Sequence, residues 1–212
     1  MDIIKVVICD DHVIFRKGLA TVLNEINEVK VTGEASNGQE LLNLMKKQDV
    51  DVILMDIRMP VMDGIEATKK IIEKKYDTKI IALTMHEEIG YFNHMIEAGA
   101  HGYLLKKTNS EELENALKQV VRGDYFFSPE FLAHAEKHFP KKTKEPTVVL
   151  TEREKEVLEF ICKGFSNPEI AKKLFLSERT IDGHRASLLE KTGAKNAPHL
   201  VMYAIRHGIV KA

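Results

Sequence analysis

Residues 6–12 read VVICDDH, in which four apolar residues run directly into two adjacent carboxylates, Asp10 and Asp11. A strand without polar residues in its middle is typical of a sheet that is covered on both faces, as parallel sheets are. Neighbouring carboxylates repel one another, so their place at the end of such a strand needs a reason. This stretch therefore predicts a buried strand that delivers charged groups to the edge of a parallel sheet.

The same rhythm continues to residue 123. Short apolar runs predict five strands, and the stretches between them carry apolar residues at helical spacing. Strand and helix alternating five times predict an α/β fold, a doubly wound five-stranded parallel sheet with helices on both faces. The strands are expected at 5–10, 29–35, 51–57, 79–85 and 102–106, and the helices at 13–26, 38–47, 64–75, 88–99 and 110–123.

Composition and charge favour two domains. The chain has 212 residues, of which 44% are hydrophobic and 30% charged, and this length suits two small cores. Residues 1–128 carry 16 Lys and Arg against 21 Asp and Glu, whereas residues 148–212 carry 11 against 8. The mildly basic second part is the one expected to meet a polyanion, although small domains often differ by a few charges without such a role.

The cysteines and the apolar runs bear on the compartment. Cys9 and Cys162 are far apart and lie among apolar residues, as buried reduced thiols do. No apolar run approaches the roughly 18 residues that a membrane span needs. We therefore expect a cytoplasmic protein without membrane contact.

A linker separates the two parts. Residues 129–147 combine prolines and lysines and lack a periodic apolar face, although the stretch PEFLAHAEKHF at its start is compatible with some helix. We place the first domain at 1–128, the linker at 129–147 and the second domain at 148–212.

Five chemically active side chains end or follow the predicted strands: Asp10, Asp11, Asp56, Thr84 and Lys106. The carboxyl ends of parallel strands meet at one edge of the sheet, where ligands bind. A single Asp in such a place more often caps the next helix, but capping does not explain all five. Clustered carboxylates need a cation to neutralise them, and oxygen ligands suit Mg²⁺. The sequence therefore predicts a magnesium site at this edge.

The motifs CDDH, LMDIRMPVMDG, ALT and GYLLK closely resemble those of the receiver domain of bacterial response regulators, over residues 3–124. The resemblance implies a flavodoxin-like fold and phosphorylation of Asp56 by a sensor histidine kinase. It further implies that Asp11 and Asp56 bind Mg²⁺ directly, Asp10 through water, and Arg58 through its backbone carbonyl. Thr84 and Lys106 would bind phosphoryl oxygens, and Tyr103 would change its packing with phosphorylation.

Some neighbouring residues leave alternatives open. Met85 follows Thr84 where a small residue is frequent in the family, and it would narrow the approach to the phosphoryl group. Arg58 and His86 occupy the positions that set the rate of dephosphorylation in such domains, and we expect that rate to be slow. His12 could ligate a metal, but imidazole suits zinc better than magnesium, so a solvent-facing or packed histidine is the favoured interpretation.

After the linker, residues 148–210 predict four helices. Capping-box patterns begin at Thr151 and Ser166, another start lies at Ser177, and glycines stand at the helix ends. Three apolar stripes suffice to close one small core. Two helices joined by the short LFLSE turn predict a helix-turn-helix, whose second helix can enter the major groove of DNA.

The segment LTEREKEVLEFICKGFSNPEIAKKL, followed by LSERTIDGH, resembles the DNA-binding domain of NarL/FixJ and LuxR-type regulators. The resemblance implies a recognition helix over 177–191. Its implied contacts with DNA phosphates are Ser177, Arg179, Thr180 and Lys191, and its groove-facing positions are Asp182, Gly183 and Ala186.

Asp182 and Arg185 are the favoured base readers. A carboxylate accepts a hydrogen bond from cytosine N4, and a guanidinium can bind guanine O6 and N7. A phosphate contact of Arg185 is an equally open alternative. His184 shares the core side of the helix with Ile181, so we expect it to pack inside. The apolar surface of the last helix, around Leu200, is a possible dimer contact.

The combination predicts a DNA-binding response regulator of a two-component system, not an enzyme, which forms a homodimer when Asp56 is phosphorylated. One alternative is a phosphatase of the haloacid dehalogenase type, which forms an aspartyl phosphate but needs a second acid where this chain has Arg58. The other alternative is a DNA-binding regulator that does not depend on phosphorylation.

Overall fold

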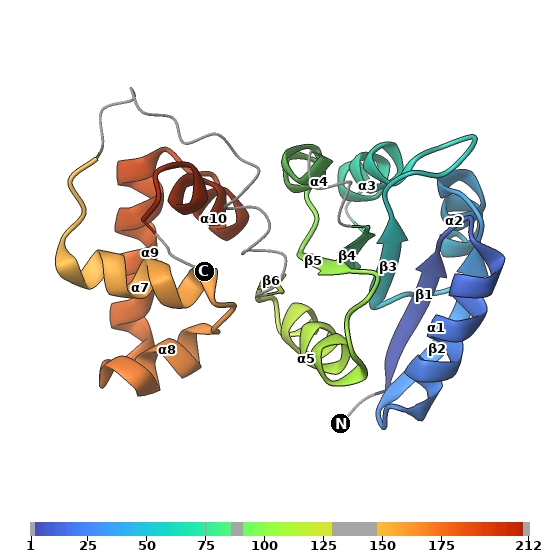
Figure 1. Cartoon of the computed structure of the whole chain (residues 1–212), viewed down its shortest axis with the longest axis horizontal. Coiled ribbons are helices and arrows are strands. Elements are labelled where there is room, and N and C mark those ends of the chain that lie inside the picture. Colours follow the sequence, from blue (N-terminus) through green and yellow to red (C-terminus); the bar gives the residue numbers. More distant parts are fainter. Residues whose placement is uncertain (1–2, 75, 86–90, 129–147, 210–212) are drawn as a thin grey trace. The chain divides into compact units, whose positions relative to one another are not determined.

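The computed structural model describes residues 3–74, 76–85, 91–128 and 148–209. The chain divides into two compact units, Met1–Phe126 and Phe127–Ala212, and each is described by itself (Figure 1). The predicted linker, 129–147, and the helical stretch at its start lie outside the described residues.

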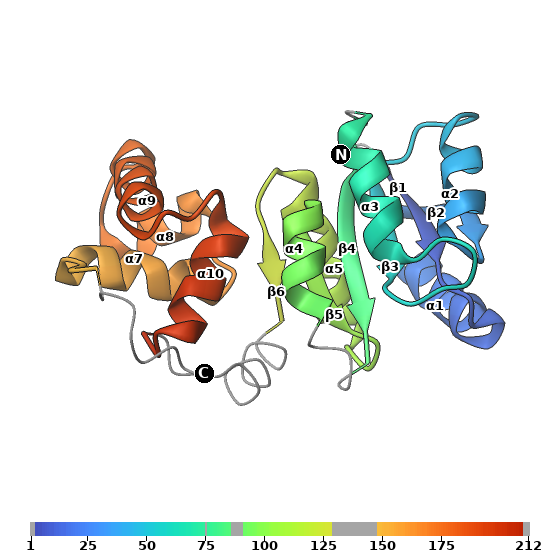
Figure 2. The same cartoon turned by 90° about the horizontal axis from the view of Figure 1, so that it is seen from above.

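The first unit is built on a sheet whose strands lie side by side in the order β2-β1-β3-β4-β5-β6 (Figure 2). The pairs β1–β2, β1–β3, β3–β4 and β4–β5 are all parallel, as predicted. The prediction of five strands was wrong by one, because a two-residue strand is too short for any periodicity to show. The strands are β1 (Ile4–Cys9), β2 (Val29–Ala35), β3 (Val52–Asp56), β4 (Lys79–Thr84), β5 (Gly102–Leu105) and β6 (Phe126–Phe127).

Helices cover both faces of this sheet (Figure 1). Alternate residues of β1 divide between the faces, and Val6 and Ile8 pack in one core with Leu113 and Leu117 of α5 and with Phe15 of α1. Helix α3 packs against α2 and α4. The helices are α1 (Val13–Glu25), α2 (Gly38–Met45), α3 (Gly64–Glu73), α4 (Phe92–Ala98) and α5 (Ser110–Val121).

The second unit holds the predicted helical bundle, with a core that includes Val157, Ile181, Leu188 and Leu200, all fully buried. The expectation of an apolar surface around Leu200 was wrong, because this core already covers that side chain. Capping boxes begin α7 and α8, and the side chain of Ser177 caps α9. These caps satisfy backbone N–H groups that have no partner within the helix. The helices are α7 (Glu152–Cys162), α8 (Asn167–Leu174), α9 (Glu178–Thr192) and α10 (Ala197–Arg206). In the described parts of both units, none of the helices is long and apolar enough to cross a membrane.

Candidate functional site

The carboxyl ends of four neighbouring strands bring the predicted acidic site together. Asp56 ends β3 beside Leu83 of β4, and Thr84 ends β4 beside Leu105 of β5. Asp10 follows β1, and the backbone N–H of Lys106, just after β5, donates to the carbonyl of Thr84 at 2.8 Å. Because the strands run parallel and end in register, residues far apart in the sequence reach one edge.

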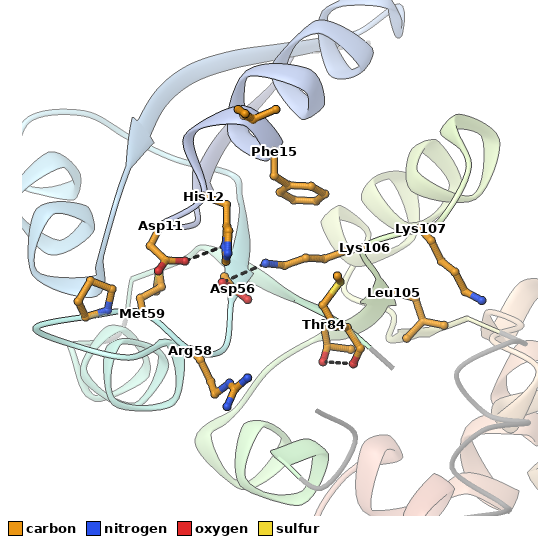
Figure 3. A pocket seen from close by; sticks show the side chains of 13 residues that line it. Asp11, His12, Phe15, Asp56, Arg58, Met59, Thr84, Leu105, Lys106 and Lys107 are labelled. Carbon is orange, nitrogen blue, oxygen red and sulfur yellow. Dashed lines mark hydrogen bonds and ion pairs between the residues drawn. The ribbon is translucent and has the colours of Figure 1, made fainter. Parts of the chain in front are cut away.

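Lys106 links two buried carboxylates, of which Figure 3 shows Asp56. Its Nζ lies 2.8 Å from Oδ2 of Asp10 and 3.0 Å from Oδ2 of Asp56. Asp10 is fully buried and Asp56 is 2% exposed. Backbone N–H groups hold the other carboxylate oxygens, because His12 donates to Asp10 Oδ1 at 2.8 Å and Ile57 to Asp56 Oδ1 at 2.9 Å. The two carboxylates therefore have fixed orientations.

The charges of this cluster do not balance. Burial and then the charge of Asp10 raise the pKa of Asp56 to about 6, and Lys106 offsets only part of this effect. Burial by itself lowers the pKa of Lys106, but its contacts with Asp10 and Asp56 raise it above its usual value. The charged form of Lys106 is favoured on balance, whereas burial and the charge of Asp10 outweigh what the ammonium does for ionised Asp56. With Asp11 included, three carboxylates face one ammonium, and the excess equals the charge of one divalent cation.

The donor set fits such a cation. Asp10, Asp11, His12 and Asp56 each offer a ligand atom, and these atoms all lie within 4.8 Å of one another. Carboxylate oxygens are the ligands that Mg²⁺ prefers. The imidazole Nδ1 of His12 lies 3.0 Å from Asp11 Oδ1, and its side chain is 70% exposed. The imidazole of His12 thus faces solvent, as expected, and also contacts the carboxylates of Asp10 and Asp11.

A cavity of about 1190 Å³ opens over these groups. Asp11, Asp56, Thr84 and Lys106 supply its polar groups, and Arg58 also lines it. Its apolar wall includes Ile14, Phe15, Met59, Pro60, Met85 and Leu105. Met85 lines this cavity beside Thr84 and is 57% exposed. His86 lies outside the described residues.

The two predicted switch residues, Thr84 and Tyr103, are buried and contact groups other than Asp56. The hydroxyl of Thr84 donates to the backbone carbonyl of Met85 at 3.0 Å and points away from Asp56 (Figure 3). Tyr103 is fully buried and packs edge to face against Phe92, with ring centroids 5.0 Å apart. Thr84 therefore has to turn before it can donate to a group on Asp56.

Two residues outside the predicted set of site residues shape the site. A Cβ at Gly64 would lie 2.1 Å from the backbone oxygen of Asp56, so only glycine allows α3 to start beside the end of β3. Arg16 donates through Nη1 to the backbone carbonyl of Asp10 at 2.6 Å and contacts Glu34 at 3.3 Å. Gly64 stands in the quoted motif and carried a weak signal. Arg16 carried none, because its contacts with Asp10 and with Glu34 of β2 depend on how α1 packs.

Helix α9 presents the predicted DNA contacts in the second unit. Ile181 and Leu188 are buried, and His184 is half-buried on the same side. The hydroxyl of Ser177 accepts from the backbone N–H of Thr180 at 3.1 Å. Among the other predicted contacts, Arg185 is half-buried, and the exposed residues are Ser177, Arg179, Thr180, Asp182, Gly183, Ala186 and Lys191.

Lys191 takes part in a contact that the sequence did not show. Its Nζ lies 2.7 and 2.8 Å from the two carboxylate oxygens of Glu154, which is 4% exposed. Ser187 and the backbone N–H of Thr151 also donate to Glu154, at 2.7 and 2.8 Å. The expected phosphate contact of Lys191 competes with this ion pair between α9 and α7.

Asn167, the first residue of α8, was also missed. Its Nδ2 donates to Asp182 Oδ1 at 2.6 Å, and its Oδ1 accepts from Nη1 of Arg185. One amide therefore joins the two side chains that were predicted to read bases. Nothing in the sequence marked this contact, because Asn167 lies in another helix.

Comparisons with known proteins identify the class. The model of the response regulator receiver domain matches residues 6–118, and that of the luxR family of bacterial regulatory proteins matches residues 148–204. The chain therefore belongs to the response regulators of the NarL/FixJ type, and it is a DNA-binding transcriptional regulator of a two-component system rather than an enzyme. Both resemblances seen in the sequence are thereby confirmed.

Individual relatives agree over nearly the whole chain. The oxygen regulatory protein NreC of Staphylococcus carnosus is 37% identical over 210 residues, which cover 95% of this chain and 97% of that protein. The transcriptional regulatory protein DegU of Brevibacillus brevis is 33% identical, with 98% and 95% covered. A structure of the response regulator RcsB in complex with DNA is 30% identical, with a TM-score of 0.59 over 96% of this chain and 98% of that one.

Proposed function

We propose that Asp56 accepts a phosphoryl group from the phosphohistidine of a sensor histidine kinase. A carboxylate oxygen of Asp56 attacks phosphorus, the P–N bond breaks, and the imidazole of the kinase leaves. The observation that carries this proposal is the contact of Lys106 with both Asp10 and Asp56, because it places a cation where the incoming charge develops.

We further propose that Asp10, Asp11, Asp56 and the backbone carbonyl of Arg58 hold Mg²⁺. The excess of negative charge in the cluster and the spacing of its ligand atoms support this assignment. When bound, the ion neutralises charge on the carboxylates and on the phosphoryl group. Lys106 then holds a phosphoryl oxygen and stabilises the product.

Thr84 and Tyr103 are proposed to transmit the change. A phosphoryl oxygen on Asp56 offers the Thr84 hydroxyl a stronger acceptor than the carbonyl of Met85 that it now uses. When Thr84 turns, it vacates space within β4 next to β5, which carries the buried Tyr103. The phosphorylated state then differs in the packing of this ring against Phe92.

DNA recognition is proposed for α9. Arg179, with the hydroxyls of Ser177 and Thr180, supplies phosphate contacts, while Asp182 and Arg185 read bases across the exposed Gly183 and Ala186. The solved RcsB–DNA complex supports DNA binding by this chain. We assign Lys191 to the ion pair with Glu154 rather than to a phosphate.

We also propose how the chain is divided into domains and how it assembles. A receiver domain at 1–128 is joined by a linker at 129–147 to a DNA-binding domain at 148–212, and the protein acts in the cytoplasm. Phosphorylation promotes a homodimer, which reads two half-sites about 10 base pairs, or a multiple of that spacing, apart.

A small phosphodonor with Mg²⁺ tests the proposal. The wild-type chain should incorporate phosphate, and Asp56→Asn should incorporate none, because an amide cannot form the acyl phosphate. Asp63→Asn serves as the matched control, since Asp63 caps α3 and is not a member of the carboxylate cluster. Persistent labelling of Asp56→Asn would refute the assignment, and unaltered DNA binding after labelling would favour a phosphorylation-independent regulator. A chelator should block labelling and leave the circular dichroism spectrum unchanged.

A further inference from the structure

We propose that Asn167 is a positioning residue for base recognition: its side-chain amide ties Asp182 to Arg185 and presents both to the same G·C-containing step. The inference rests on the proposed role of these two residues as base readers. It adds a third residue, from a different helix, which sets how the readers are held before DNA arrives.

The contacts define the arrangement. Asn167 donates from Nδ2 to Asp182 Oδ1 at 2.6 Å and accepts at Oδ1 from Nη1 of Arg185. Asp182 and Arg185 are three residues apart on α9, so they lie on neighbouring turns of one face. An amide combines a donor and an acceptor in one rigid plane, as a bridge between a carboxylate and a guanidinium requires.

The backbone of Asn167 is itself held in place. Ser166 caps α8 in a capping box, in which its backbone N–H donates to Glu169 at 2.8 Å, and Pro168 restricts the first turn. Capping therefore does not need the side chain of Asn167, which is left to contact α9. The burial of Ile170 and Ile181 packs the two helices together and maintains the distance between them.

The bridge uses one carboxylate oxygen of Asp182 and one guanidinium nitrogen of Arg185. Asn167 occupies one oxygen of Asp182, so Oδ2 remains to accept from cytosine N4. Its contact with Arg185 involves Nη1, and a guanidinium has other N–H groups of the kind that bind guanine O6 or N7. The hydrogen bond from Asn167 to Asp182 also reduces the free-energy cost of bringing the charge of this carboxylate close to DNA phosphates. Fixing the long Arg185 side chain in advance reduces the entropy lost on binding.

The expected effect is moderate and specific. Ordering one long side chain on binding weakens the affinity by about two- to twelvefold. Asn167→Ala should therefore weaken binding to the preferred duplex within this range and leave binding to a scrambled duplex nearly unchanged. A residue that only contacted a phosphate would weaken both duplexes alike and lower the salt dependence.

The experiment uses the full-length phosphorylated chain and a duplex selected from a random pool with the wild-type protein. Binding to this duplex and to its scrambled form is titrated at several salt concentrations for the wild type, Asn167→Ala, Arg185→Ala and the double variant. If Asn167 positions both readers, Asn167→Ala causes a smaller loss of discrimination in the Arg185→Ala background than in the wild type, because only its contact with Asp182 is left to lose. Additive losses would overturn the inference.

A second variant separates positioning from helix stability. Asn167→Asp keeps the size and the acceptor but loses the donor and repels Asp182, while an acid in the first turn favours helix α8. We expect unchanged thermal stability and reduced discrimination. Full discrimination by this variant would contradict the inference. Asn43→Ala, an exposed helical asparagine of the receiver, is the matched control and should change neither quantity.

The outcomes also separate this inference from the proposed function. If Arg185→Ala weakens both duplexes equally, Arg185 is not a base reader, and the inference fails with the proposed role. If Arg185→Ala lowers discrimination but Asn167→Ala does not, the base reader stands and the role of Asn167 is refuted.

Discussion

Lys191→Ala tests the ion pair between α7 and α9. Glu154 is buried, and burial alone raises the pKa of its carboxyl, but hydrogen bonds from Lys191, Ser187 and Thr151 outweigh burial and lower the pKa to about 2. Against the ordinary value of 4.5, this shift corresponds to about 3 kcal/mol in favour of the folded state. The Lys191 side chain is 35% exposed, so solvent screening reduces its share. We expect Lys191→Ala to lower the free energy of unfolding by about 2 kcal/mol at pH 7.

The pH dependence has a defined sign. Because the folded-state pKa of Glu154 is depressed, its contribution is fully present above about pH 4.5 and is lost as the pH falls toward 2. The cost of Lys191→Ala should therefore be constant from pH 7 to pH 5 and shrink below that.

Pulse-labelling hydrogen exchange in urea provides the assay, because peptides of α7 and α9 report the second unit separately from the receiver. Lys155→Ala is the control, since Lys155 pairs with Glu152, which is 87% exposed, and should cost less than about 0.5 kcal/mol. Equal urea midpoints for the two variants would refute the reasoning. If Lys191→Ala instead left stability unchanged and lowered the salt slope of DNA binding by about one, Lys191 would be a phosphate contact after all.

Three further predictions concern stability. Gly64→Ala should destabilise the receiver by more than about 2 kcal/mol in urea titrations, because the new Cβ would meet the backbone oxygen of Asp56. Gly18→Ala, which has open space around the added Cβ, should stabilise the receiver by about 0.5–1 kcal/mol. Equal effects of the two substitutions would contradict this prediction. Burial lowers the pKa of His101 to about 4, so the receiver should lose about 2 kcal/mol between pH 8 and pH 5 as the unfolded state takes up the proton; His101→Asn should flatten that slope. Phe175 has an exposed side chain (94%) and a left-handed backbone conformation with φ 55°. Phe175→Gly should therefore raise the melting temperature of the second unit, because it relieves about 1 kcal/mol of backbone strain. A lower melting temperature would contradict this prediction.

Periodicity within single elements was enough to predict most of the architecture. Apolar runs and helical stripes predicted the parallel sheet and the four C-terminal helices, because burial on one or two faces leaves a pattern within a single element. It failed for β6, Phe126–Phe127, which has too few residues to form a pattern. The boundaries at Ser177 and Thr151 were legible because capping is a local interaction.

The acidic site was predicted for a topological reason. Once strands are parallel, their carboxyl ends must share an edge, so Asp10, Asp56 and Lys106 could be placed together from sequence alone. Which atoms meet was not predictable. The two contacts of Lys106, the turn of Thr84 toward Met85 and the close approach at Gly64 depend on distances between elements.

Contacts between helices were decided only by the tertiary structure. The pairing of Lys191 with Glu154 and the bridge from Asn167 to Asp182 and Arg185 join residues that sequence spacing does not relate. The sequence by itself determined which faces are apolar and where each element begins, since these properties are local. The partners of each charged side chain depend on how the helices cross and pack, and packing is a property of the whole core.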